Sequence, residues 1–164
     1  MAEQSAGILL FRRTCSGPEL LLVHPGGPFW KNRDLGAWSI PKGLCDEGEE
    51  PLGAAKREFY EETGSAPRGA FISLGTFKQP SGKQLMAWAV EGEFDVASFK
   101  SNRFSMEWPP KSGRLQDFPE TDRAGWFKPA EAMRKVTRGQ LPIVQTLLAK
   151  LDASGRPVDF AGAP

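Results

Sequence analysis

The sequence predicts an α/β fold in which helices cover a mixed β-sheet. Three observations favour this fold: strand-like apolar runs lie near the start, a single amphipathic helix pattern occupies 51–63, and two more helix patterns follow further strands. This order differs from a regular βαβ repeat. With 164 residues and 40% apolar side chains, the chain can build one core and is too short for two ordinary domains. We therefore expect one domain over 1–151 and a loose tail over 152–164.

The first predicted elements form a β-hairpin. Residues 6–11 and 20–24 are short apolar runs separated by a Gly-Pro turn. The next segment, 25–33, mixes turn residues with aromatic and basic side chains, which predicts a loop that could hold a ligand. Residues 38–40 predict a brief strand, which Pro41 stops.

The most clearly defined helix comes next. Pro51 suits the first helical position, and Gly64 suits the position just past the end. Leu52, Ala55 and Phe59 give the segment between them an apolar stripe. The later chain predicts strands at 70–77, 85–94 and 123–127, and helices at 129–136 and 141–151.

Composition excludes several classes of function. The net charge of +1 gives no sign of a nucleic-acid or membrane partner. Cys15 and Cys45 lack the number and spacing of a disulfide framework or a zinc site. The single histidine, His24, supports few triads or zinc sites, and we expect it to be structural, at a strand end. No apolar run approaches the ~20 residues that span a bilayer, so we expect a soluble, cytoplasmic protein that relies on carboxylates, cations and metal.

The predicted helix carries an acidic edge. At about 100° per residue, Glu58, Glu61 and Glu62 fall within an arc of about 100° beside the apolar stripe. Like charges at these spacings repel, and a bound cation would relieve that cost. Oxygen ligands favour Mg²⁺, with Mn²⁺ as the alternative. The competing interpretation is a solvated acidic face on which Arg57 and Glu61 form an ordinary i,i+4 ion pair.

Hydrolysis of a diphosphate fits such a site. Magnesium commonly combines a few carboxylates with substrate phosphates, so the phosphates complete the coordination. The metal would neutralise phosphate oxygens and lower the pKa of a bound water, which could then attack phosphorus.

A longer motif surrounds this acidic edge. The sequence reads Gly43, five residues, Glu49, seven residues, and then Arg57-Glu58-Phe59-Tyr60-Glu61-Glu62-Thr63-Gly64. This spacing closely resembles the Nudix box. The resemblance implies a Nudix-type α/β/α sandwich with a mixed β-sheet. Ser65 departs from the family, which usually carries an apolar residue there, but that position packs rather than catalyses.

The resemblance also implies roles for single residues. Glu58, Glu61 and Glu62 would be metal ligands, with Glu62 the leading one and the Gly43 carbonyl as a further ligand. The remaining box residues, Arg57 and Glu49, would pair and hold the loop against the helix from outside the ligand set.

Relatives often use one more acidic residue, from a loop shortly before a strand that bears tryptophan. Glu120, six residues before Trp126, fits this position best as base or accessory ligand. Glu93, Glu107 and Asp117 are its competitors.

Substrate-binding candidates lie before the box and in a later loop. Trp38-Ser39-Ile40-Pro41-Lys42-Gly43 resembles the Trp-x-x-Pro-Lys-Gly variant of relatives that cut dinucleoside or diphosphoinositol polyphosphates. Lys42 would then place a charge near an extended phosphate chain. The segment 103–114 mixes cations with aromatics and predicts a long loop that acts as a lid or specificity element. Further candidates for stacking or phosphate binding are Phe29, Trp30 and Trp38, with Lys31 and Arg33; core packing is the favoured fate of at least one of the aromatics.

These features together predict a metal-dependent pyrophosphohydrolase that cuts a phosphoanhydride bond in a nucleoside diphosphate linked to another group. Dinucleoside polyphosphates lead as substrates, followed by nucleoside triphosphates and diphosphoinositol polyphosphates. We expect a small nucleotide or polyphosphate as the partner, with no membrane and no extended nucleic acid. The oligomeric state is not predicted.

Two other functions compete with hydrolysis. A catalytically inactive Nudix-like domain could bind or sense a nucleotide, but such domains usually lose box carboxylates, and here all are present. An isomerase on the same fold would need a dedicated catalytic cysteine. Cys45 lies within the loop of the box, residues 44–50, which we call the box loop. It is better interpreted as a small side chain that fills space.

Overall fold

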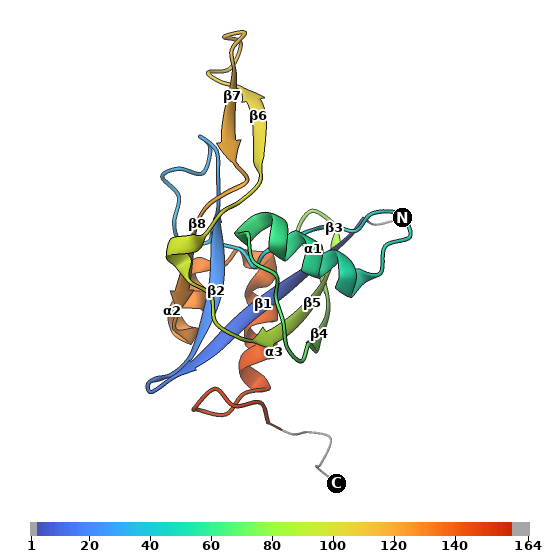
Figure 1. Cartoon of the computed structure of the whole chain (residues 1–164), viewed down its shortest axis with the longest axis vertical. Helices are drawn as coiled ribbons and strands as arrows, with labels where there is room; N and C mark the ends of the chain where they lie inside the picture. Colours follow the sequence, from blue (N-terminus) through green and yellow to red (C-terminus); the bar gives the residue numbers. More distant parts are fainter. Residues whose placement is uncertain (1–2, 159–164) are drawn as a thin grey trace.

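The computed structural model describes residues 3–158, and these build a sheet between two layers of helices (Figure 1). The strands are β1 (Gln4–Thr14), β2 (Gly17–Pro25), β3 (Lys42–Leu44), β4 (Ile72–Lys78), β5 (Gln84–Glu91), β6 (Arg103–Glu107), β7 (Leu115–Pro119) and β8 (Thr121–Phe127). The α-helices are α1 (Pro51–Thr63), α2 (Pro129–Lys135) and α3 (Leu141–Ala149), and short 3₁₀ helices are η1 (Val96–Ser98) and η2 (Arg138–Gln140).

The main sheet is mixed, as the sequence predicted. Its order is β4-β5-β1-β2-β8, and β3 pairs with β1 off this path. Strand β1 runs parallel to β5 and antiparallel to β2 and β3. The predicted hairpin is thus confirmed as β1 and β2. The start of β1 pairs with the short strand β3. This pairing fixes the position of Lys42 and Gly43, which lie opposite Gly7 and Ala6.

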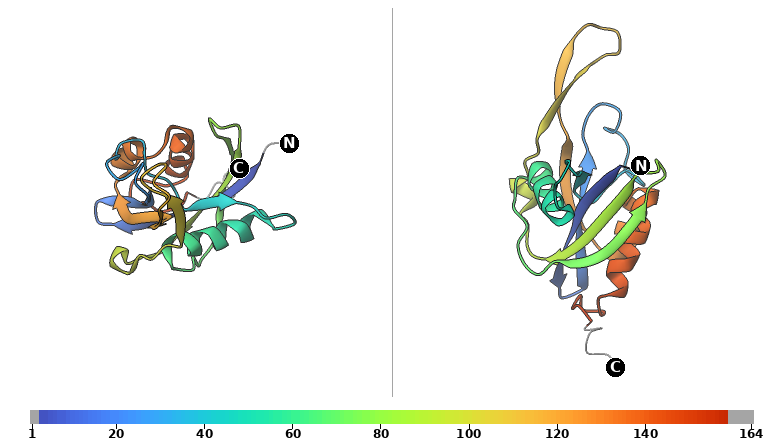
Figure 2. Two further views of the ribbon diagram at one scale, coloured as in Figure 1. Left: turned by 90° about the horizontal axis from the view of Figure 1, so that it is seen from above. Right: turned by 90° about the vertical axis from the view of Figure 1, so that its right-hand side faces the viewer.

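Two hydrophobic layers hold the helices on opposite faces of the sheet (Figure 2). Ile8 and Leu10 of β1 face Phe59 of α1, whereas Leu9 and Phe11 face the layer of α2 and α3. Side chains alternate between the faces of a strand, so one apolar run serves both layers. The predicted α/β/α sandwich is confirmed.

Helix α1 has the bounds that its end signals predicted. Pro51 occupies its first turn, and Gly64 follows its end in the left-handed conformation with φ 82°. The Gly64 N–H donates to the Tyr60 carbonyl over 2.7 Å, which satisfies a helix-end acceptor. The acidic edge therefore lies in the last two turns of a helix with a fixed end.

Two short segments differ from the prediction. Residues 38–40 do not form a strand of their own; Ser39 makes an isolated bridge to Val23 of β2. Strand β3 begins just after Pro41 and was not predicted, because three residues carry too little periodicity to identify a strand. Its partner β1 holds it through the pairing of Gly43 with Ala6.

The predicted long loop over 103–114 is wrong. Strands β6 and β7 form a hairpin that projects from the body of the protein (Figure 1). We call residues 103–119 the arm. Its register pairs Phe104 with Phe118 and Met106 with Gln116. The strands are short and the turn rich in proline and glycine, so the turn signals dominated the sequence pattern.

The remaining predictions concern the chain end and the histidine. Residues 152–158 form a turn in which Leu151 bridges to Pro157, and the predicted tail beyond 158 lies outside the described residues. His24 is fully buried near the end of β2, where its ring contacts Asp122 and the Arg33 carbonyl at 2.9 and 2.6 Å. Its structural role is thus confirmed. Within residues 3–158 no helix is long and apolar enough to cross a bilayer.

Candidate active site

The acidic edge of α1 faces strand β3 across a very close contact. The Glu58 carboxylate lies so near Gly43 that a β-carbon added at Gly43 would overlap it. A side chain at that position would force the Glu58 carboxylate to move. The backbone of β3 and the carboxylates of α1 therefore share one small space, as the box resemblance implied for the Gly43 carbonyl.

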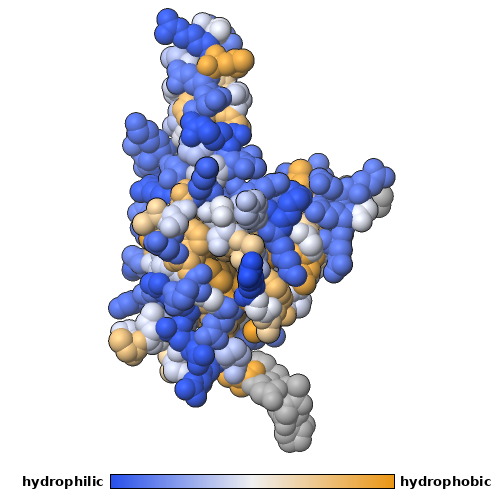
Figure 3. All heavy atoms as spheres, viewed as in Figure 1, coloured by the Kyte–Doolittle hydropathy of each residue, from blue (hydrophilic) through white to orange (hydrophobic). Residues whose placement is uncertain are grey.

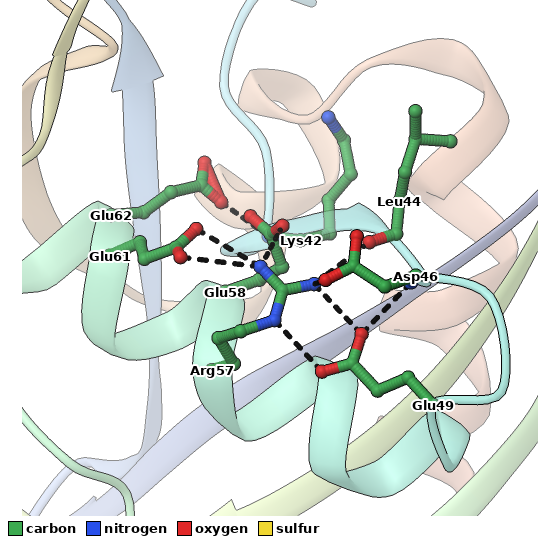
Figure 4. A network of polar contacts seen from close by, with 8 residues as sticks. All are labelled: Lys42, Leu44, Asp46, Glu49, Arg57, Glu58, Glu61 and Glu62. Atoms are coloured by element: carbon green, nitrogen blue, oxygen red, sulfur yellow. Dashed lines mark hydrogen bonds and ion pairs between the residues drawn. The ribbon is translucent and has the colours of Figure 1, made fainter.

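Arg57 ties the box loop to the helix (Figure 4). Its Nε and Nη2 donate to the two carboxylate oxygens of Glu49 over 2.8 and 3.0 Å, and Nη2 also donates to the Leu44 carbonyl. The predicted pairing of Arg57 with Glu49 is confirmed. These bonds, together with the Asp46 N–H, lower the pKa of Glu49 to about 2.

The same guanidinium reaches the acidic edge. Arg57 Nη1 donates to Glu58 over 2.9 Å and to Glu61 over 3.2 Å. The i,i+4 ion pair of Arg57 and Glu61 therefore exists, but as one arm of a larger network. The hydrogen bond to Glu49, followed by those to Glu58 and Glu61, raises the pKa of Arg57, so the guanidinium stays charged and offsets repulsion between the carboxylates.

Glu62 lies deepest of the three carboxylates. Its side chain is 8% exposed, and its Oε2 accepts the Lys42 backbone N–H over 2.5 Å. Burial raises the pKa of Glu62 to about 8, although the Lys42 charge and this hydrogen bond act in the opposite direction. Burial also raises the pKa of Glu58. Removing a carboxylate from water is costly unless a cation compensates for the lost hydration.

The donors present fit a divalent metal that prefers oxygen. In residues 3–158 no three acidic, histidine or cysteine side chains already converge on a point, because Arg57 binds Glu58 and Glu61 while β3 binds Glu62. The groups of the acidic edge and of β3 that could coordinate a metal nevertheless all do so through oxygen atoms. A cation would also compensate for the burial of the Glu62 carboxylate. Glu58, Glu61, Glu62 and the Gly43 carbonyl are the groups that would hold it.

Glu120 lies at the junction of β7 and β8, near this edge. Its carbonyl accepts the Gly26 N–H over 2.8 Å, and its negative charge adds to the rise in pKa of both Glu58 and Glu62. The three competitors lie elsewhere: Glu93 binds Arg12, while Glu107 and Asp117 make hydrogen bonds within the arm. Glu120 is thus the best placed of the four candidates.

A pocket of about 570 Å³ opens beside β3. Its wall includes Lys42, Gly43 and Trp30 together with Gln79 and Lys83 of the β4–β5 turn. The sequence interpretation missed the two β4–β5 residues, because no local motif marks that turn. A molecule in this pocket would contact Lys42 and Gly43 of β3, whereas Glu58, Glu61 and Glu62 are not among the residues that line it.

The aromatic and basic candidates separate into two groups. Trp38 is only 5% exposed, and its ring packs edge-on against His24 and Phe127 at centroid distances of 5.2 and 4.8 Å. The prediction that Trp38 stacks on a base is wrong, because the strand bridge at Ser39 turns this ring into the core. Phe29 and Trp30 are 61% and 39% exposed.

The two basic candidates of the same loop are exposed as well. Lys31 and Arg33 both lie at the surface, and the Arg33 guanidinium lies 5.7 Å from the centroid of the Trp30 ring. The cations and the two exposed aromatics thus remain on the surface near the pocket, whereas Trp38 does not.

The fold and the site together define a class of protein: an α/β/α sandwich that presents an acidic helix edge beside a short strand, whose glycine meets the helix and whose lysine lines a pocket. The family model for the NUDIX domain matches residues 1–147. The chain belongs to the Nudix family.

Known relatives and solved structures agree with this assignment. An RNA pyrophosphohydrolase of Bartonella henselae is 67% identical over 66 residues, 38% of this chain and 35% of the relative. An 8-oxo-(d)GTP phosphatase of Mycolicibacterium smegmatis is 26% identical over 127 residues, 76% of this chain and 38% of the relative. The chain thus spans only about a third of the length of these curated relatives.

The structural neighbours share the fold at low sequence identity. A Caenorhabditis elegans Ap4A hydrolase in a binary complex superposes with a TM-score of 0.62 at 19% identity, covering 88% of this chain and 96% of that one. The NUDIX domain of Shewanella oneidensis NrtR with ADP ribose gives 0.63 at 16% identity, covering 91% and 88%.

The Arg57–Glu49 pair predicts a specific loss of stability in acid. The pKa of Glu49 in the folded protein is about 2, below the usual 4.5, so the pair stabilises the fold above about pH 4.5 and its contribution disappears as the pH falls toward 2. Glu49→Gln should remove this part of the pH dependence and lower stability at neutral pH. Urea unfolding across this pH range measures it. Glu47→Gln, an exposed neighbour in the same loop, should keep the wild-type slope; equal slopes in all three proteins would contradict the role of the pair.

Proposed function

We propose that the protein is a metal-dependent hydrolase that cuts a phosphoanhydride bond in a nucleoside polyphosphate, with Mg²⁺ favoured and Mn²⁺ as the alternative. The observation that carries this proposal is the buried Glu62 carboxylate, which lies against the backbone of Lys42 at the pocket. A buried anion at the mouth of a site for phosphate is unfavourable unless a cation lies between them.

Each residue has a distinct part in this reaction. Glu58, Glu61, Glu62 and the Gly43 carbonyl would hold the metal, which when bound polarises phosphorus and lowers the pKa of water. Arg57 keeps Glu58 and Glu61 in place through Nη1 and holds the box loop through Glu49. Glu120 is our candidate to accept the proton of the attacking water at its carboxylate.

The pocket orients the substrate relative to these groups. Lys42 carries a positive charge at the boundary between the pocket and the acidic edge, where phosphates beyond the reacting one would lie. Trp30 offers an exposed ring in the same wall for a base. We favour dinucleoside polyphosphates as substrates, followed by nucleoside triphosphates and diphosphoinositol polyphosphates.

A second substrate has support from the relatives. Several that match over short segments bear the name RNA pyrophosphohydrolase, which makes the 5′-polyphosphate end of RNA a candidate. A product-resolved panel distinguishes the substrates: diadenosine polyphosphates, canonical and oxidised triphosphates, nucleotide sugars, diphosphoinositols and 5′-triphosphorylated RNA, each with and without Mg²⁺. Ligand binding without turnover, independent of metal, would instead favour an inactive sensing domain.

The Glu62→Gln variant tests the metal site. The amide has nearly the shape of the buried carboxylate and can still accept the Lys42 N–H, so the variant should fold normally. Turnover should be almost abolished. A variant that keeps more than about a tenth of wild-type kcat, a loss under about 1.4 kcal/mol, would show that Glu62 is not the leading ligand. Glu50→Gln, exposed just before α1, is the control and should keep full activity.

The Glu120→Gln variant tests the proposed base. Loss of the proton acceptor should lower kcat much more than it raises KM, because the group acts in the transition state rather than in binding. Steady-state kinetics with Mg²⁺ measure both constants. Glu93→Gln, whose carboxylate binds Arg12 instead, serves as the control. If kcat is unchanged in Glu120→Gln, another carboxylate takes the proton.

The Lys42→Ala variant tests the ranking of substrates. A long polyphosphate can contact both the metal and Lys42, whereas a triphosphate makes fewer such contacts, so the variant should affect long substrates most. A lost charge-assisted contact corresponds to about ten- to a hundredfold in kcat/KM. The measurement compares diadenosine tetraphosphate with ATP and dGTP, and Lys128→Ala, an exposed lysine before α2, is the control. Equal losses for all substrates, or a wild-type preference for triphosphates, would overturn the ranking.

A further inference from the structure

The base of the arm is bonded directly to the end of helix α1. The Asn102 N–H donates to the Glu61 carbonyl over 2.9 Å, and Thr121 Oγ1 donates to the Glu62 carbonyl over 2.7 Å. Two metal-ligand candidates therefore hold the arm through their own backbone. The base of the arm therefore lies beside the end of the helix that carries the acidic edge.

The loop between β2 and β3 joins the arm to the pocket. The Phe29 ring packs edge-on against Trp108 at the end of β6, with centroids 5.2 Å apart and an angle of 81°. Gly27 of the same loop lies against the Phe104 ring. The next residue after Phe29, Trp30, lines the pocket. A series of aromatic rings thus leads from the pocket to the far half of the arm.

The two faces of the arm differ in character. Phe104 and Met106 share one face with their cross-strand partners Phe118 and Gln116, and the loop with Phe29 lies against this face. Leu115 pairs with Glu107 on the other face. In the view of Figure 3 the arm is mainly hydrophilic, with a small apolar patch near its tip.

Basic side chains accompany the aromatic rings. Lys111 and Arg114 lie at the turn of the arm, Lys31 lies in the adjoining loop, and none of the three has an ion-pair or side-chain hydrogen-bond partner in residues 3–158. The two acidic residues of the arm are already engaged: Glu107 accepts the Lys111 backbone N–H, and Asp117 accepts the Ser105 hydroxyl. Both donors are neutral, so the two carboxylates keep their charge, and with Arg103, Lys111 and Arg114 the arm carries a net charge of +1.

We propose that Phe29 and Trp108, with Lys31, Lys111 and Arg114, bind the downstream nucleotides of a single-stranded oligonucleotide whose 5′-polyphosphate end occupies the pocket. The proposal rests on the proposed function and decides between its substrates. Stacking rings combined with cations along one path are the recognition chemistry of single strands, and this chemistry does not read sequence. The five residues of β6 extend roughly 17 Å, beyond what a mononucleotide in the pocket requires.

A direct binding experiment tests the stacking part. Fluorescence anisotropy would follow a 3′-labelled, 5′-hydroxyl single-stranded decamer in EDTA, so that neither metal nor turnover contributes. Trp108→Ala should weaken binding about 5- to 100-fold, the range for loss of one stacked base. Leu115→Ala removes an exposed apolar side chain from the other face of the same arm and should leave the Kd unchanged.

A second pair of variants tests the contribution of the basic side chains. Lys111→Ala/Arg114→Ala should weaken binding and reduce the slope of log Kd against log salt by about 1.4, since each phosphate contact on a single strand contributes about 0.7. Arg68→Ala/Lys128→Ala removes two exposed cations outside the arm and should keep the wild-type slope. This test remains decisive if the tryptophan variant fails to fold.

Three results would overturn the inference: no binding of the decamer by the wild type, equal binding by wild type and both arm variants, or equally tight binding of poly-glutamate. Hydrolysis is measured in a separate experiment. If no 5′-triphosphate or dinucleoside polyphosphate is cut with Mg²⁺, the proposed function fails. If short substrates are cut while the decamer binds no more weakly to the arm variants, the proposed function stands and the arm inference fails.

Discussion

The guanidinium of Arg57 is the contact on which the arrangement of the site depends. It bonds at once to Glu49 of the box loop, to the Leu44 carbonyl beside β3, and to the acidic edge through Glu58 and Glu61. Without it, carboxylates of two segments would repel one another across a partly buried space. With it, strand, loop and helix keep fixed relative positions. A planar group with five donors can make these bonds together, and lysine cannot.

The burial of Glu62, in contrast, lowers the stability of the site. Its burial under β3 leaves a carboxylate whose charge the network of Arg57 does not neutralise directly, since its bond is to a backbone N–H. Burial raises the pKa of Glu62 and so favours its protonated form, and a bound cation would be needed to keep the group charged beside β3. Such local cost is expected where a cation and a phosphate are to bind. Thr121, which follows the arm, donates to the carbonyl of this same residue, so the acidic edge and the proposed strand-binding surface are joined through α1.

The sequence by itself determined the local features. Pro51 and Gly64 set the ends of α1, because each residue restricts or permits particular backbone angles wherever it occurs. The spacing on the helix identified the acidic edge, since fixed offsets on a helix fix relative positions in space, whereas the pairing of Arg57 with Glu49 was implied by the family resemblance. The apolar runs at 6–11 and 20–24, separated by a Gly-Pro turn, likewise predicted the hairpin of β1 and β2. These inferences depend only on neighbours within a few turns.

Tertiary structure decided the features that join distant segments. Trp38 carries an aromatic ring that could stack on a base, but its backbone bridges to Val136 and its side chain is buried in the core. The arm forms because Phe104 pairs with Phe118 across a turn that contains proline and glycine. Local signals had predicted a loop there. Gln79 and Lys83 reach the pocket only because β4 and β5 extend the sheet next to β1. The net charge gave no sign of a nucleic-acid partner, because a sum over the chain carries no positions, and the cations noted at 103–114 took their place on a hairpin only in the tertiary structure. Periodicity reports which face a residue takes within its own element, whereas packing between elements decides what that face meets.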